Sequence, residues 1–323
     1  MARWNPQRYQ DEGEKQGIDP GVLDAASKAI ANIQAVNPSL PPILTLMHLS
    51  KVTEVNYPYL REIVGRKIDP YKSFALRKRT PGLHRTRTIH VPEDYLLTVQ
   101  RWISRAILRQ AAPHSASFGY HPGSSPVTAA RRHRNAKWLI KIDLKDFFDN
   151  IREPAVFDVF RSLGYGSLIS FEMARIVTRA PDAKRAQIAI DEHRIPFYSV
   201  DSNGFLPQGA PTSPMLSNLV MRGLDAKLQE LANEHDFRYS RYADDLVFSC
   251  RDQKSRSAAQ TLRDAALQAL RAGGFTPNMR KTTIVAPGGR KIVLGLLGAV
   301  EVQGFFWGLF VIQAADGTIC ADG

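Results

Sequence analysis

Residues 241–249, RYADDLVFS, constrain the fold most strongly, because two adjacent aspartates interrupt a stretch that otherwise resembles a β-strand. The flanking aromatic and β-branched residues favour strands, whereas Asp disfavours them. Asp tolerates tight turns and left-handed backbone, so we predict a β-hairpin whose turn carries both Asp244 and Asp245. The alternative is an acidic surface turn without function. Motifs elsewhere in the chain are needed to distinguish it from a functional turn.

A third aspartate follows another predicted strand. Residues 137–148, KWLIKIDLKDFF, begin as a nearly continuous apolar run, and Asp143 falls toward the end of that run. Burying a carboxylate is costly unless a cation or hydrogen bonds compensate it. Pairing this strand with the hairpin would bring three repelling carboxylates together. Magnesium takes oxygen ligands, and two ions about 4 Å apart promote phosphoryl transfer. The three aspartates therefore predict a two-metal site.

The charge of the chain favours a polyanionic partner. Lys and Arg total 43 against 31 acids, which gives a formal net charge of +12. Residues 61–90 alone hold nine basic and two acidic residues. A basic patch of this kind is typical of nucleic-acid binding, although a basic soluble protein without such a partner would have a similar overall charge.

Cysteine content and hydropathy indicate a cytoplasmic protein. Cys250 and Cys320 are too few for a disulfide framework or a cysteine-based zinc site, and the first residues lack the apolar core of a signal peptide. Residues 292–312 approach the length of a membrane span, but Glu301 and Gln303 lie near the middle, and four glycines interrupt the stretch. We therefore expect no membrane segment.

The N-terminal part of the chain is predicted to be helical. Asp19 before Pro20, followed by apolar residues at helical spacing, predicts a capped helix over 20–35. Residues 43–64 contain two short apolar periods around a turn. This second segment also fits a helix-turn-helix reader of duplex DNA, which we keep as an alternative.

A basic hairpin and two amphipathic helices are predicted further along. Basic and apolar residues alternate over 71–92, which predicts a β-hairpin suited to holding phosphates, or an edge strand protected by its charges. Helical spacing predicts a helix over 94–111. Another is predicted from Ser213 as N-cap and Pro214 as first residue, with an apolar face that continues to Leu231.

Taken in order, these motifs resemble those of reverse transcriptases. They are HRTRTIHVP, IKIDLKDFF, FLPQGAPTSP, RYADDLVFS, NMRKTTI and RKIVLGLL, and they span roughly residues 70–298. The resemblance implies an α+β right-hand polymerase fold and an RNA-directed DNA polymerase. We expect a helical N-terminal extension (1–70), fingers (71–135), a palm with an interleaved fingers segment (136–300) and a C-terminal tail (301–323) in place of a full thumb.

The resemblance also implies roles for individual residues. Asp143, Asp244 and Asp245, with the carbonyl of Leu144, would bind two Mg²⁺ ions, for which Mn²⁺ could substitute. Lys281 would be the general acid near the departing pyrophosphate. The nucleotide-binding residues would be Lys78 and Arg87 at the triphosphate, Phe148 as the gate against a 2′-hydroxyl, and Gln208 and Gly209 beside the nucleotide. We also expect seven residues to contact the nucleic acid: Arg77, Arg79, Arg85, Arg131, Arg132, His133 and Tyr242.

Within this family the sequence resembles bacterial retron enzymes, through PHSASFGYHPGSS and VFRSLGY. That resemblance implies a noncoding RNA as template and primer, dNTP substrates, a branched RNA-DNA product, and an effector protein in antiphage defence. Two motifs depart from it: Ala129 to His133 replaces Asn-Ala-x-x-His, and Val293-Leu294-Gly295 replaces Val-Thr-Gly. A different defence-associated reverse transcriptase, or an RNA-binding protein of polymerase fold without activity, remains an alternative.

Overall fold

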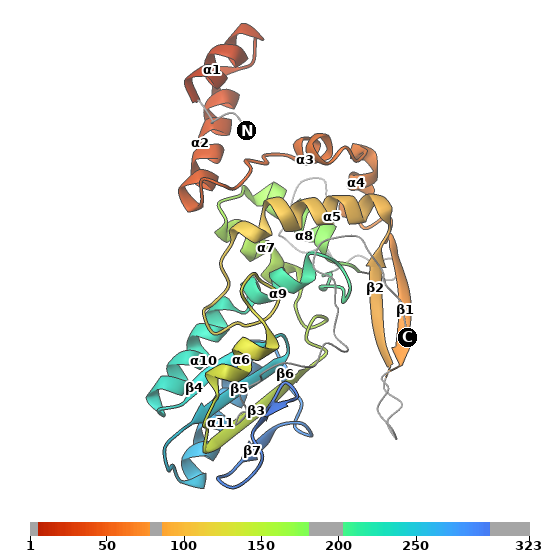
Figure 1. Ribbon diagram of the computed structural model, residues 1–323. Coiled ribbons are helices and arrows are strands. Elements are labelled where there is room, and N and C mark those ends of the chain that lie inside the picture. Colours follow the sequence, from red (N-terminus) through yellow and green to blue (C-terminus); the bar gives the residue numbers. More distant parts are fainter. Residues whose placement is uncertain (1–5, 78–85, 181–202, 298–323) are drawn as a thin grey trace.

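The computed structural model describes residues 6–77, 86–180 and 203–297, and it combines helices with antiparallel sheets (Figure 1). The helices are α1 (Pro6–Lys15), α2 (Pro20–Val36), α3 (Leu46–Thr53), α4 (Tyr57–Val64), α5 (Asp94–Ala106), the 3₁₀ helix η1 (Leu108–Gln110), α6 (Pro126–Arg132), α7 (Glu153–Ser162), α8 (Ser167–Val177), α9 (Ser213–Val220), α10 (Arg222–Glu234) and α11 (Arg256–Ala272). The strands are β1 (Tyr71–Arg77), β2 (Thr86–Pro92), β3 (Trp138–Lys145), β4 (Arg238–Tyr242), β5 (Asp245–Cys250), β6 (Thr276–Pro277), β7 (Thr283–Val285), β8 (Ile292–Val293) and β9 (Leu296–Leu297).

The largest sheet pairs the two segments that carry the aspartates. Its strand order is β4-β5-β3-β6, and β7 also pairs with β3. All of these pairings are antiparallel. The predicted hairpin is therefore formed by β4 and β5, and β5 lies directly beside the predicted strand β3.

Alternate residues of β3 contribute to two different cores. Ile140 and Ile142 belong to the main hydrophobic core, whereas Leu139 packs with Val247 and Val293 in a smaller cluster. Successive side chains of a strand point to opposite faces, so Asp143 shares the face of Leu139. Helices α10 and α11 contact strands of this sheet and contribute to the main core. The aspartate therefore lies on the face that these helices leave uncovered.

The N-terminal helices begin as the sequence predicts. The side chain of Asp19 accepts a hydrogen bond from Val22 N at the start of α2, which is the predicted cap. Helices α3 and α4 form the two halves of the proposed helix-turn-helix segment, but Leu49 and Leu60 are fully buried in the main core. This packing joins the segment to the rest of the molecule and does not indicate an independent DNA-binding unit.

The basic hairpin is formed by β1 and β2, which pair from Tyr71–Pro92 to Arg77–Thr86. It extends from the N-terminal end of α5, beside the main body (Figure 1). The tip at 78–85 and the tail at 301–323 lie outside the described residues. No helix in the described ranges is long and apolar enough to cross a membrane.

The helix predicted from Ser213 is in fact two helices. Thr212 occupies the N-cap position of α9, and the Ser213 hydroxyl donates to Pro207 O rather than capping. The helical hydrogen-bonding pattern is interrupted at Met221, which ends α9 and precedes α10. Apolar spacing alone could not locate this break, because both helices bury their apolar faces in the same core.

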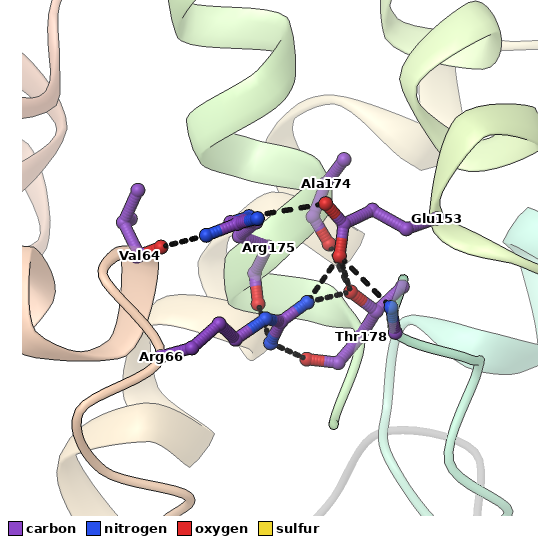
Figure 2. Close-up of polar contacts among 7 residues, drawn as sticks. Val64, Arg66, Glu153, Ala174, Arg175 and Thr178 are labelled. Atoms are coloured by element: carbon purple, nitrogen blue, oxygen red, sulfur yellow. Dashed lines mark hydrogen bonds and ion pairs between the residues drawn. The ribbon is translucent and has the colours of Figure 1, made fainter. Parts of the chain in front are cut away.

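A buried ionic cluster joins the N-terminal helices to the body (Figure 2). Glu153 Oε1 accepts from Arg175 Nε at 3.1 Å, and Oε2 pairs with Arg66 and accepts from Gly204 N at 3.1 Å. Arg175 in turn donates to Val64 O at 2.8 Å. The cluster connects α4, α7 and α8 to the segment that leads into Pro207 and Gln208. Removing one member of such a cluster is costly, because the remaining charges would stay buried and unpaired.

Candidate active site

The three aspartates converge at one end of the large sheet. Asp143 of β3 is the direct register partner of Asp245 of β5. Directly opposite residues in antiparallel strands have Cα atoms about 4.5–5.5 Å apart. Leu144 N donates to Asp244 O at 3.0 Å, so the third aspartate is bound to the same end of β3. Segments a hundred residues apart in sequence therefore bring the backbones of the three aspartates to one end of the sheet.

The turn between β4 and β5 differs from the prediction in one respect. Tyr242 pairs with Asp245, so the two-residue turn consists of Ala243 and Asp244, and Asp245 is already the first residue of β5. The positive φ of 54° is at Ala243 and not at either aspartate. Positive φ is unfavourable for Ala, so the surrounding contacts must stabilise the turn.

A fully buried ion pair supports this turn. Arg241 donates to both carboxylate oxygens of Asp225 on α10, at 2.8 and 2.7 Å, and both residues are fully buried. The same guanidinium donates to Ala243 O at 3.2 Å and to Asn218 Oδ1 at 3.1 Å. Burial acts to lower the pKa of Arg241, but the hydrogen bonds and charge of Asp225 outweigh it and raise that pKa. Helices α9 and α10 thus fix the backbone just before Asp244.

The electrostatics at the turn show a concentration of negative charge. Burial, with the charges of Asp244 and Asp143 added, raises the pKa of Asp245 from 3.8 to about 6. Burial also raises the pKa of Asp244, and Asp143 contributes in the same direction. Arg87 and Lys281 oppose the rise at Asp244. The nearby cations therefore compensate the carboxylates only partly.

Lys281 and Asn278 hold the carboxylate of Asp143. Asn278 Nδ2 donates to Asp143 Oδ1 at 2.8 Å, and Lys281 Nζ forms an ion pair with Oδ2. Asn278 N also donates to Asp143 O at 2.7 Å. Asn278 is buried, whereas the Lys281 side chain is 45% exposed. Sequence reasoning placed Lys281 near the reaction but did not single out Asn278, three residues before it in the same motif.

The carboxylates fit a divalent metal by their chemistry. Across the described ranges, no three His, Cys, Asp or Glu side chains are grouped in a way that could hold a metal ion. Both oxygens of Asp143 are engaged by Asn278 and Lys281. Carboxylate and carbonyl oxygens are nevertheless the ligands that magnesium prefers. The raised pKa values of Asp244 and Asp245 indicate charge that a cation would stabilise.

An aromatic row borders the turn. The rings of Tyr120 and Phe148 have centroids 6.4 Å apart, and those of Tyr120 and Tyr242 are 6.2 Å apart. All three side chains are half-buried. A Cβ on Gly119 would lie 3.4 Å from Ala243 N, at van der Waals contact, so this segment passes close to the turn. The sequence identified Phe148 and Tyr242, but Tyr120 was not singled out.

The Pro-Gln-Gly loop packs against the basic hairpin. Gln208 O accepts from His90 N at 2.7 Å. Gly209 has a φ of 114°, and a Cβ there would lie 2.7 Å from Ile89 Cγ2. Gly209 therefore permits a close approach of this loop to β2, and its position beside a nucleotide stays a prediction.

The predicted phosphate-binding residues are only partly described. Arg87 is exposed on β2, and its charge acts to lower the pKa of Asp244, which links it electrostatically to the carboxylates. Arg77 is the last residue of β1. Lys78, Arg79 and Arg85 lie outside the described residues.

Two of the three residues predicted around α6 to bind nucleic acid contact the large sheet. His133 is 1% exposed, and its ring nitrogens bond to Ser249 Oγ at 2.7 Å and Ser240 Oγ at 2.6 Å. Burial lowers its pKa to about 3. Arg132 Nε donates to Tyr239 O at 2.7 Å. These contacts argue against direct contact of His133 with nucleic acid, whereas Arg131 is exposed.

Comparisons with known proteins agree with this geometry. Residues 76–303 match the family model described as "Reverse transcriptase (RNA-dependent DNA polymerase)". The retron Ec86 reverse transcriptase of Escherichia coli is 32% identical over 268 residues, covering 83% of this chain and 75% of the relative. The retron Mx65 and Mx162 reverse transcriptases of Myxococcus xanthus are each 32% identical over 71% and 70% of this chain. The chain spans about half the length of these last two relatives, 51% and 47%.

Proposed function

Because the chain belongs to the reverse transcriptase family and is of its retron type, we propose that it copies a structured noncoding RNA into DNA at the Asp143, Asp244 and Asp245 carboxylates. The family has the right-hand polymerase fold and RNA-directed DNA polymerase activity. The observation that carries the proposal is the pairing of Asp143 with Asp245 beside the turn that bears Asp244. The fingers (71–135) and palm (136–300) boundaries, with the helical extension before them, are part of the proposal.

The carboxylates and the Leu144 carbonyl would hold two Mg²⁺ ions, or Mn²⁺ in their place. Bound metal would supply charge stabilisation for the attacking and leaving oxygens of phosphoryl transfer. In the metal-free protein the ion pair with Asp143 places the Lys281 ammonium at this site. Once it is displaced from Asp143 by metal, the ammonium would donate a proton to the departing pyrophosphate. Arg87 would neutralise charge on the incoming triphosphate.

The aromatic row would select the nucleotide. Phe148 lies five residues after Asp143 in sequence, and its ring packs against Phe147 and Tyr120 at centroid distances of 5.4 and 6.4 Å. Rings held in this way form a rigid wall, which would exclude a ribose 2′-hydroxyl and so favour dNTPs. Gln208 and Gly209 would border the same nucleotide from the hairpin side.

The retron resemblance extends the proposal to partners. The RNA would serve as both template and primer, giving a branched RNA-DNA hybrid in the cytoplasm. An effector protein of an antiphage defence system would be the protein partner. The net charge of +12 supports a nucleic-acid partner.

A second candidate function is RNA binding without synthesis. The engagement of both Asp143 oxygens by Asn278 and Lys281 favours it, because the carboxylate is already neutralised without metal. This candidate predicts salt-sensitive RNA binding that survives Asp244→Asn, with no synthesis by either protein.

Primer extension distinguishes the two candidates. Purified protein would be given poly(rA)·oligo(dT), dTTP and magnesium, and DNA products would be resolved on a gel. We expect extension by the wild type and none above background by Asp244→Asn. Asp252→Asn is the matched control, because it makes the same chemical change at an exposed position just beyond β5. Synthesis by Asp244→Asn, or none by the wild type on this duplex or on the RNA that copurifies with it, would overturn the proposal.

A further inference from the structure

A groove lies between α3 and α5, outside the carboxylate site. Its volume is about 440 Å³. Val52 and Glu54 line it from α3 and the residue after α3, and Thr98, Arg101, Trp102 and Arg105 line it from α5. None of the predicted catalytic or nucleotide-binding residues contributes to its lining. The catalytic mechanism proposed above therefore gives this groove no role.

The exposed side of α5 carries both aromatic and basic side chains. Tyr95, Thr98, Trp102 and Arg105 follow helical spacing, while Val99 and Ile103 on the opposite side are fully buried. Tyr95 is 68% exposed and packs edge-on against Tyr59 at 5.8 Å. Tyr95 lies seven residues before Trp102, so this exposed ring is on the same side of α5 as the groove.

The two groove arginines have no acidic partner among the described residues. Arg101 and Arg105 are exposed and stand one helical turn apart, and neither forms an ion pair within the described ranges. Glu54 is the single acidic residue in the lining. The groove therefore presents positive charge next to the half-buried Trp102.

We propose that this groove binds a single-stranded segment of the RNA, with a base against Trp102 and phosphates at Arg101 and Arg105. Aromatic rings interleaved with basic residues are typical of single-strand binding, because every base has a face that can stack. Arginine also stacks on bases and pairs with phosphate. The inference depends on the proposed function for the choice of RNA, which must be bound before any DNA is made. Stacking on Trp102 favours a base over an acidic peptide, whose carboxylates would engage only the arginines.

Photocrosslinking tests the position of the contact. The probe is a 30-nucleotide single-stranded RNA containing 4-thiouridine, added to the full chain with the active site saturated by a blunt-ended RNA·DNA duplex, which leaves no single-stranded competitor. We expect crosslinks in the α5 peptide that contains Trp102, and weaker ones with the matching thiolated DNA. Crosslinks to DNA alone, or none in residues 98–106, would overturn the proposal.

Charge reversal tests the role of the arginines. Arg101→Glu with Arg105→Glu should weaken binding of the RNA probe at least tenfold. It should also reduce the slope of log affinity against log salt by about 1.4, at about 0.7 per phosphate contact on a single strand. Arg222→Glu with Lys227→Glu, two exposed positions on α10, is the control with the same change of charge. An unchanged slope, or an equal loss in the control, would contradict the proposal.

Failure of the proposed function would give a different result. Extension of poly(rA)·oligo(dT) by the wild type is measured in parallel. If the wild type extends nothing while the Trp102 crosslink forms, the catalytic proposal fails and the groove assignment stands. If extension proceeds without the crosslink, the groove assignment fails alone.

Discussion

Replacing Asp245 by asparagine is expected to stabilise the metal-free protein while abolishing DNA synthesis. The pKa of Asp245 is raised from 3.8 to about 6, first by burial and then by Asp244 and Asp143. Each pH unit between these values corresponds to about 1.36 kcal/mol. Holding this carboxylate ionised in the fold therefore costs about 3 kcal/mol at pH 8, which a neutral amide of similar shape avoids.

The pH dependence gives the prediction its sign. A carboxylate with a raised pKa binds a proton more readily in the folded chain, so its contribution to stability is present at low pH and is lost as pH rises from 3.8 to about 6. The stability advantage of Asp245→Asn should thus be about 3 kcal/mol at pH 8 and about half of that at pH 5. Titrating groups that do not interact with Asp245 are common to both proteins and cancel.

Urea denaturation in EDTA at both pH values measures this difference, and primer extension with magnesium measures activity. Adding magnesium should then stabilise the wild type more than the variant, because the ion binds only the folded carboxylate site. A variant that is no more stable than the wild type at pH 8, or an advantage independent of pH, would refute the electrostatic account of the site.

Three further predictions follow from individual contacts. Asn278→Ala removes a hydrogen bond to the Asp143 carboxylate. In steady-state extension kcat should fall about 10- to 100-fold, while KM for dTTP stays within about twofold of the wild-type value. An unchanged kcat would contradict a positioning role. Asp225→Ala leaves the Arg241 guanidinium buried without its partner, so the free energy of unfolding measured in urea should fall by about 3–5 kcal/mol. A loss below about 1 kcal/mol would contradict the stabilising role of this ion pair. Burial lowers the pKa of His133 from 6.5 to about 3, so the stability that the neutral ring contributes to the fold is lost as pH falls below 6.5. Between pH 7 and pH 5 the wild type should therefore lose about 2 kcal/mol more stability than His133→Gln. Equal losses would show that His133 becomes protonated without unfolding.

The pairing of β3, β4 and β5 could be predicted from sequence because residue type and period agree there. Apolar runs identified the strands, and aspartates at their ends identified the point of convergence. The position of the positive φ could not be predicted, because Asp tolerates it better than Ala. Ala243 adopts it in a turn whose backbone also bonds to the buried guanidinium of Arg241.

Residues that act through tertiary contacts escaped the sequence analysis. Asp225 is one charged position on an amphipathic helix, and only the fold shows that it is fully buried against Arg241. The run Arg131-Arg132-His133 is typical of a nucleic-acid contact, but the end of α6 directs His133 inward to two serines. Tyr120 has no periodic neighbours, and its position beside Phe148 follows from long-range packing.

Anomalous scattering from Mn²⁺ in crystals of the protein with a primed RNA template and a nonhydrolysable dNTP tests the central claim most directly. The account predicts two manganese peaks bounded by the carboxylates of Asp143, Asp244 and Asp245, with the Lys281 ammonium displaced from Asp143. Manganese found only elsewhere, or Asp143 still paired with Lys281 in the loaded complex, would contradict it.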